Sequence, residues 1–188
     1  MRGRDIKRYG YDFADLYLIN THNGVKEKGI KRINIEDYPA VKAHLDLFYP
    51  QLEKRADQGD TPYNLRNCAY IEDFSKQKIM YSEIVREPQF YLDNKGEFFA
   101  EATTFIMIGE HLEYLYHLLH SKIVTFFFKT FYAGGGLGTD GYRYKKIFLE
   151  KLPIPKDIID INNENNIEKV VSQLYKLTEE EINYINSL

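Results

Sequence analysis

The spacing of hydrophobic positions changes along the chain and predicts its secondary structure. Residues 13–19 (Phe-Ala-Asp-Leu-Tyr-Leu-Ile) have the composition of a strand, and a turn signal follows them. Residues 36–56 carry apolar side chains at helical spacing, which predicts a helix that Pro50 ends or kinks. Residues 77–108 then predict a β meander, with strands expected at 78–85, 89–92 and 97–108.

The rest of the chain is predicted to be mainly helical. Residues 110–132 have helical periodicity, with a possible break capped by Ser121. A glycine-rich loop is expected at 134–138. A closing helical region starts near Asn165, and the Thr178 segment has the spacing of a capping box, so a second short helix is expected there.

Together these elements predict an α+β fold, with a mixed central β-sheet region flanked by helices and a helical C-terminal end. We divide the chain into a main domain over residues 1–156 and a helical C-terminal extension over 157–188, packed on or beside it. The chain opens directly on Met1-Arg2-Gly3-Arg4 with no lead-in, so we expect a fragment of a longer protein, a natural short protein being the alternative.

Composition narrows the class of protein. The 188 residues are 44% hydrophobic and 28% charged, which is typical of a soluble globular domain with a substantial core. The apolar runs are too short to span a membrane and no signal segment opens the chain, so no membrane partner is expected. The single cysteine, Cys68, suits a reducing compartment, and we expect a cytoplasmic protein.

The net charge of −3 is unevenly distributed. Residues 1–32 hold eight Lys/Arg against four Asp/Glu, and residues 141–156 hold five against one. The middle of the chain (33–140) sums to −6 and the tail (157–188) to −5. Two basic segments therefore bracket an acidic body, which permits an anionic partner; solvated surface charge is the other interpretation.

Catalytic and metal-binding motifs are incomplete in this sequence. The glycine-rich stretch 134–141 precedes Tyr142, where a phosphate-binding loop needs Lys and then Ser or Thr. Glu83 lacks the Lys two residues later that metal-dependent nucleases use. Residues 61–64 lack the leading Asn-Pro-Pro with which an amino-methylating enzyme grips an extruded base. The histidines of one helical segment do not converge on a metal ion (His111, His117, His120). We therefore predict no catalytic residues, no metal site and no cofactor on this chain.

Five segments, taken in order, resemble one family. The strongest is residues 55–68 (Arg-Ala-Asp-Gln-Gly-Asp-Thr-Pro-Tyr-Asn-Leu-Arg-Asn-Cys). The others are residues 2–9 (Arg-Gly-Arg-Asp-Ile-Lys-Arg-Tyr), 35–45, 78–83 and 141–155. The ordered set resembles the TaqI-like C-terminal specificity domain, the target-recognition domain of type IIG and related adenine-N6 restriction-modification enzymes. The chain departs from the family's aromatic pattern by having tyrosines in place of tryptophans (Tyr17, Tyr63, Tyr81).

The resemblance implies a DNA-reading module that is not itself an enzyme. Its parent would carry an adenine-N6 methyltransferase domain upstream, and often a nuclease domain, with S-adenosylmethionine and Mg²⁺ as the parent's cofactors. This chain would hold double-stranded DNA while that methyltransferase domain flips an adenine. Residues 152–155 (Leu-Pro-Ile-Pro), followed by an acidic helix, also resemble the junction before the spacer helix in type I specificity subunits.

The candidate DNA contacts fall in three segments of suitable chemistry, because phosphates call for Lys/Arg and base edges for Arg, Asn or Gln. The alternatives are a solvated basic segment for the first group, a loop braced by its own side chains for the second and a charged helix face for the third. The candidates are Arg2, Arg4, Lys7 and Arg8; Tyr63, Asn64, Arg66 and Asn67; and Tyr142, Arg143, Lys145 and Lys146.

Two other functions compete with DNA recognition. One is a protein-interaction or specificity-subunit module that contacts partner proteins through its terminal helices, using an apolar stripe of Leu174, Tyr175, Ile182 and Ile185. The other is a small stand-alone enzyme, which the incomplete motifs disfavour. DNA affinity that falls steeply with salt separates the first alternative from DNA recognition, because only counterion release gives a large slope.

Overall fold

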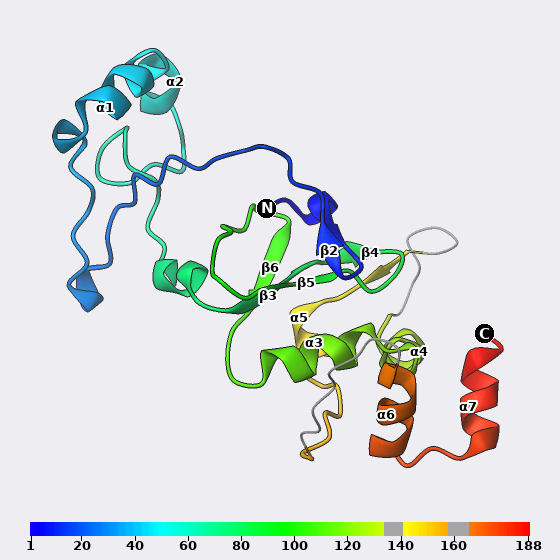
Figure 1. Ribbon diagram of the computed structural model, residues 1–188. Coiled ribbons are helices and arrows are strands. Elements are labelled where there is room, and N and C mark those ends of the chain that lie inside the picture. The colour runs from blue at the N-terminus through cyan, green and yellow to red at the C-terminus, as the bar shows by residue number, and fades with distance from the viewer. Residues whose placement is uncertain (134–140, 158–165) are drawn as a thin grey trace. The chain divides into compact units, whose positions relative to one another are not determined.

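The computed structural model describes residues 1–133, 141–157 and 166–188 (Figure 1). The predicted glycine-rich loop at 134–138 lies outside them. Within the described residues, no helix combines the length and the apolar character that crossing a lipid bilayer requires.

The described residues form two compact units. The first unit contains Met1–Asp15 and Asp73–Leu188, and the second contains Leu16–Glu72. The units therefore do not divide near residue 156: the C-terminal helices belong to the same unit as the main sheet, and the second unit interrupts the first in sequence.

The first unit is built on a three-stranded antiparallel sheet of β3 (Lys78–Ser82), β5 (Phe90–Asp93) and β6 (Thr104–Met107). Its strand order is β5-β3-β6, so β3 is central and Ile79 pairs with both Leu92 and Met107. The predicted meander is therefore wrong in its order. The physical reason lies in the loop after β5, where the amides of Glu97 and Phe98 donate to the Asp93 carboxylate instead of to a strand.

Two shorter antiparallel pairs complete the strands. The β1 strand (Ile6–Lys7) pairs with β2 (Gly10–Tyr11), and β4 (Ile84–Val85) pairs with β7 (Tyr142–Arg143). A short 3-10 helix, η1 (Gly3–Asp5), precedes β1, and α5 (Lys146–Leu149) follows β7.

The helices of the first unit cover its core. The break at Ser121 is confirmed: α3 (Leu112–His120) and α4 (Lys122–Phe131) meet there, and the Ser121 hydroxyl accepts from the amide of Val124 at 3.1 Å. Both C-terminal helices are also confirmed, as α6 (Ile167–Leu174) and α7 (Glu179–Asn186), the latter with the expected capping box. The core between helices and sheet is largely aromatic. The Tyr144 ring lies 4.6 Å from that of Phe128 and 4.9 Å from that of Phe90.

A fully buried ion pair anchors the main sheet. The Lys78 ammonium lies 2.5 Å from the Asp93 carboxylate, with the two side chains 0% and 1% exposed, and it also donates to the Phe74 carbonyl. Burial has the largest single effect on the pKa of Asp93, and by itself it would raise that pKa because it favours the neutral acid. The hydrogen bonds from Lys78 and two backbone amides nevertheless lower the pKa of that carboxyl below its usual range. The pair thus fixes the start of the loop between β5 and β6.

The second unit contains two short helices and little regular sheet. The helical prediction for 36–56 is confirmed with a break, as α1 (Pro39–Asp46) and α2 (Tyr49–Glu53), and Pro50 lies in the first turn of α2. Three 3-10 segments accompany them: η2 (Lys26–Lys28), η3 (Ile35–Asp37) and η4 (Ile71–Ser75), the last of which straddles the boundary between the units.

The strand predicted at 13–19 is wrong. These residues have no strand assignment, and five of their apolar side chains are exposed (Phe13, Leu16, Tyr17, Leu18, Ile19). A strand requires a hydrogen-bonding neighbour as well as β-forming side chains, and no ladder includes this segment. The predicted α+β class is confirmed: the described residues form helices and small sheets, and every described strand pair is antiparallel, so the central sheet is not mixed.

Candidate nucleic-acid interface

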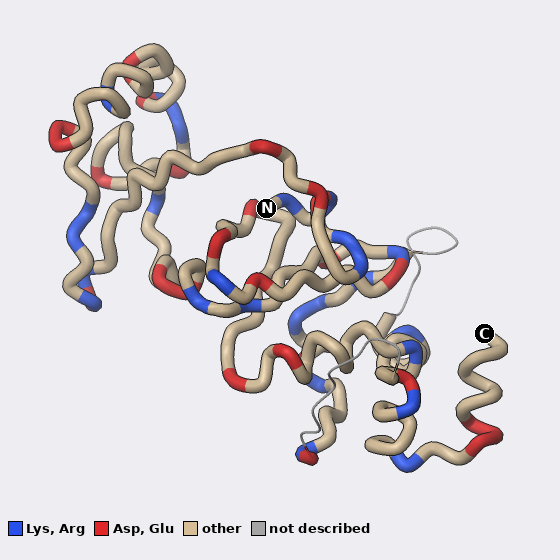
Figure 2. The backbone as a smooth tube through the Cα atoms, viewed as in Figure 1, with Lys and Arg blue, Asp and Glu red and all other residues tan. Residues whose placement is uncertain are grey.

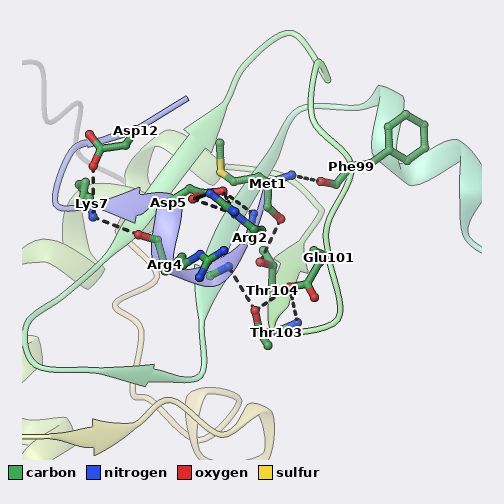
Figure 3. Close-up of polar contacts among 11 residues, drawn as sticks. Met1, Arg2, Arg4, Asp5, Lys7, Asp12, Phe99, Glu101, Thr103 and Thr104 are labelled. Atoms are coloured by element: carbon green, nitrogen blue, oxygen red, sulfur yellow. Dashed lines mark hydrogen bonds and ion pairs between the residues drawn. The ribbon is translucent and has the colours of Figure 1, made fainter. Parts of the chain in front are cut away.

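The basic N-terminal segment is partly used in the protein's own structure. The Arg2 guanidinium is bonded to the Asp5 carboxylate through its Nε at 3.0 and 3.1 Å and through Nη2 at 2.7 Å (Figure 3). The hydrogen bonds from Arg2 lower the pKa of the Asp5 carboxyl, against the opposing effect of burial. Asp5 is buried, so Arg2 is held against the protein surface and braces η1.

The segment before η1 is also tied to the residues that lead into β6. The terminal amine of Met1 donates to the Phe99 carbonyl at 2.5 Å, and the Glu101 amide donates back to Met1 at 3.0 Å (Figure 3). Gly3 packs closely there: a Cβ would lie 2.7 Å from the Ser82 hydroxyl and 3.0 Å from the Thr103 carbonyl oxygen. The motif at residues 2–5 therefore has a structural role in addition to any role in binding.

The other cations of this segment differ in the contacts that they make within the protein. Arg4 is exposed and has no ion-pair partner among the described residues. Lys7 pairs with exposed Asp12 at 3.3 Å and donates to the Arg4 carbonyl at 3.0 Å. Arg8 lies over the Tyr9 ring at 5.2 Å and donates to the His120 carbonyl at 3.2 Å. Arg4 is the most available of the four cations for an external phosphate.

The loop at residues 58–67 is organised around Asn64. This side chain is 2% exposed, and its amide nitrogen donates to the Ile33 carbonyl at 2.9 Å and lies 3.4 Å from the Thr21 carbonyl. Its amide oxygen accepts from the Thr61 hydroxyl at 2.7 Å. We predicted Asn64 as a DNA contact; the structure corrects this, because its polar atoms are buried and bonded within the unit. For Asn64, the structure therefore supports the second interpretation, a loop braced by its own side chains, over base reading.

The other candidates of this loop are more exposed than Asn64. Arg66 is 69% exposed at its side chain and forms only a long ion pair, 3.6 Å, with exposed Asp57. Asn67 is exposed and accepts from the amide nitrogen of Asn23 at 2.6 Å. The Tyr63 hydroxyl donates to Asp46 at 2.6 Å, and this hydrogen bond, more than burial, raises the pKa of Tyr63 to about 12. Tyr63 is therefore a neutral phenol that fastens the loop to α1.

The structure brings in polar residues that the sequence did not single out. The Asn23 amide nitrogen donates to Asp60 as well as to Asn67, and its oxygen accepts from the Asp60 amide at 2.8 Å. Arg32 lies 3.7 Å from the same Asp60. Gly24, at φ +75°, packs closely against residues 30–32, where a Cβ would lie 2.4 Å from the Ile30 carbonyl oxygen. Asn23-Gly24 looks like an ordinary turn in sequence, and the pairing with a distant loop has no sequence signal.

The third group of candidates divides between core and surface. Tyr142 is 4% exposed and its hydroxyl lies 3.2 Å from that of Tyr144, so the predicted DNA contact at Tyr142 is corrected to a core position. Arg143 remains exposed and lies 3.7 Å from Glu83. Lys146 pairs with Glu150 one helical turn later, at 3.6 Å, and Lys145 is exposed just before α5. Along the described chain, Lys and Arg residues are interspersed with Asp and Glu residues (Figure 2).

The geometry offers no arrangement for metal chemistry in the part of the chain that is described: no three His, Cys, Asp or Glu side chains there lie close enough together to hold an ion. What the surface does offer is exposed Arg, Lys and Asn side chains on braced loops.

Residues 1–154 match the TaqI-like C-terminal specificity domain. The chain belongs to this family. A comparison with curated proteins found no match.

Membership of this family gives the chain its general role. A TaqI-like specificity domain recognises DNA targets in restriction-modification enzymes, and it is a recognition module, not a catalytic one. The match includes the second unit and all three groups of candidate residues. The specificity domain so defined ends just before residues 155–188, which contain α6 and α7.

Proposed function

We propose that this specificity domain holds and reads duplex DNA for an adenine-N6 methyltransferase domain, and in some arrangements a nuclease domain, located upstream in the same cytoplasmic parent protein. The observation that carries the proposal is the family match over residues 1–154. S-adenosylmethionine and Mg²⁺ would act in the parent's other domains. Base flipping needs a partner that keeps the duplex in register, and we propose that this chain is that partner.

Exposed side chains of two kinds support a division of labour within the domain. Arg4, Lys145 and Lys146 are exposed cations suited to phosphate contact, which positions DNA without reading it. Arg66 and Asn67 project from a loop that Asn64 braces, and they are the side-chain types that pair with guanine and adenine edges. A braced loop carrying exposed Arg and Asn is a suitable platform for base reading.

The protein-interaction alternative has less support. Leu174, Tyr175 and Ile185, three residues of the apolar stripe proposed for partner binding, are partly buried and pack against the core of the first unit. The stripe thus contributes to the packing of α6 and α7 within this chain. An interaction with the parent's methyltransferase domain is part of the main proposal and does not depend on this stripe.

Two assays test the proposal at the level of the whole function. The chain alone, incubated with duplex DNA and S-adenosylmethionine or Mg²⁺, should neither methylate nor cleave. Profiling of methylated sites across a randomised DNA library should show that the parent's site preference changes when loop residues of this domain are replaced. Turnover by the chain alone that a point substitution within it abolishes would contradict the proposal, and so would an unaltered site profile after deletion of residues 1–154.

A further inference from the structure

A hollow of about 510 Å³ lies in the first unit between the β1–β2 turn, α4 and the end of α7. Three cationic side chains line it: Arg8, Lys122 and Lys129. No Asp or Glu side chain is among its lining residues. Leu188 also lines it, with an apolar side chain.

The sequence spacing explains why the two lysines share this hollow. Lys122 and Lys129 are seven residues apart in α4, which places them on one face of the helix about two turns apart. Arg8 comes from the turn between β1 and β2, far away in sequence. The local positive charge is therefore assembled by the fold and is not visible as a basic run in the sequence.

The cations of the hollow are oriented without being neutralised. The Lys129 ammonium lies 4.8 Å from the centre of the Tyr142 ring, and Arg8 lies over the Tyr9 ring. Ring faces attract a cation but accept few of its hydrogen bonds, so N–H donors remain for an anion. Lys122 and Lys129 have no ion-pair partner among the described residues. Aromatic rings thus hold Arg8 and Lys129 in place without cancelling their charges, and Lys122 is an exposed cation beside them.

The amide at the start of α4 is already satisfied and is not part of this site. The backbone N–H of Lys122 donates to the Glu168 carboxylate at 2.7 Å. His120 lines the hollow but is neutral near pH 7, because burial lowers its pKa to about 4. The positive character of the hollow therefore comes from the side chains of Arg8, Lys122 and Lys129.

We propose that this hollow binds a phosphodiester group of duplex DNA, in addition to the contacts made by the loop of the second unit. The inference rests on the proposed function, because it takes DNA as the source of the phosphate. A tetrahedral anion with several acceptor oxygens suits three convergent cations, and each phosphate neutralised releases condensed counterions. The hollow would position the duplex and would carry no sequence information.

The test uses the 188-residue chain, duplex DNA and several salt concentrations. The double variant Lys122→Gln/Lys129→Gln should lower the slope of log affinity against log salt by roughly one to two units. The matched control, Lys95→Gln/Lys176→Gln, removes two exposed lysines of the same unit that do not line the hollow and should leave the slope unchanged. Because Lys122 and Lys129 are both exposed, the double variant should keep its melting temperature, and Lys122→Gln alone should give part of the effect.

The possible outcomes separate this inference from the proposed function. A wild-type chain that binds DNA, with a double variant that keeps the full salt slope, overturns the inference and leaves DNA recognition intact. Equal losses in the double variant and the control also overturn it. Stabilisation of the wild type by inorganic phosphate that the double variant loses, without any change in DNA affinity, assigns the hollow to free phosphate and overturns it. A wild type that fails to bind duplex DNA contradicts both proposals.

Discussion

The guanidinium of Arg2 and the carboxylate of Asp5 form an ion pair with an Nη2–Oδ1 distance of 2.7 Å, in which Asp5 is buried and Arg2 is held against the 3-10 helix that starts the chain. Arg4, two residues later, is exposed and has no ion-pair partner among the described residues. Two arginines of one basic segment therefore lie in different environments, and substitution can separate their effects.

Arg2→Ala should lower the melting temperature of the chain, because it leaves the buried Asp5 carboxylate without its cation. Arg4→Ala should leave the melting temperature unchanged and lower the salt slope of DNA binding by roughly one unit. Thermal unfolding and DNA titration of both variants check this. A loss of stability in Arg4→Ala equal to that in Arg2→Ala would contradict the assignment.

Removal of one partner from the buried pair of Lys78 and Asp93 should strongly destabilise the first unit. Lys78→Met leaves an uncompensated carboxylate in the core and should reduce the free energy of unfolding by about 3–5 kcal/mol. Lys76→Met is the matched control: Lys76 pairs with Asp73 at 2.7 Å but is 59% exposed, so its loss should cost less than about 1 kcal/mol. Urea unfolding of the two variants measures the difference, and similar costs would refute the structural importance of the buried pair.

Local elements were predictable from sequence, whereas their partners were not. The Ser121 break, the Pro50 break and the Thr178 capping box depend on side chains within a few residues of each other, and all three are confirmed. The strand at 13–19 and the order of the main sheet depend on which distant segment supplies hydrogen bonds. Sequence periodicity has no information about that choice, and both predictions are wrong.

For the candidate site too, the sequence shows the type of each residue but not whether its side chain is buried. Residue type suggested Asn64 and Tyr142, but burial decides whether a polar side chain faces a ligand or the core, and both are buried. Arg66 and Asn67 follow Asn64 closely and are exposed. The hollow at Lys122 and Lys129 was missed because its third cation, Arg8, comes from a segment far away in sequence.

Acid should destabilise the first unit through His120. Burial lowers the pKa of His120 to about 4, with Arg8 and His117 adding to the effect and the hydrogen bond to the Tyr116 carbonyl opposing it. The unfolded histidine has a pKa near about 6.5, so the unfolded chain takes up the proton first as the pH falls. This contribution to stability is full above about pH 6.5, declines progressively toward pH 4, and amounts to roughly 3 kcal/mol.

The variant His120→Phe should remove the pH dependence between about pH 6.5 and 4 while keeping an aromatic ring against Tyr9. His44→Gln, which replaces an exposed histidine, should leave that dependence unchanged. Unfolding midpoints across this pH range provide the measurement. An acid-induced loss of stability that persists fully in His120→Phe would show that other groups cause it.

Asn64 and Arg66 should respond in opposite ways to truncation. Asn64→Ala removes the donor to the partly buried Ile33 carbonyl and the acceptor of the Thr61 hydroxyl, and it should cost about 1–3 kcal/mol of stability. Arg66→Ala should change stability by less than about 0.5 kcal/mol. If Arg66 contacts a guanine edge in the parent enzyme, its loss should cost about 1–3 kcal/mol on the cognate site and relax the preference at one base position. An unchanged methylated-site profile with a lowered melting temperature in Arg66→Ala would leave it with a bracing role only.

Titration of the 188-residue chain with duplex DNA at a series of salt concentrations shows whether it binds DNA as a recognition domain. DNA recognition by this domain predicts weak binding here, because the proposed methyltransferase domain is absent from the assay and the net charge is −3. It also predicts that log affinity falls with log salt by roughly 0.9 for each phosphate neutralised. Binding that does not change with salt, or no binding even at low salt, would show that the chain does not recognise duplex DNA in this way.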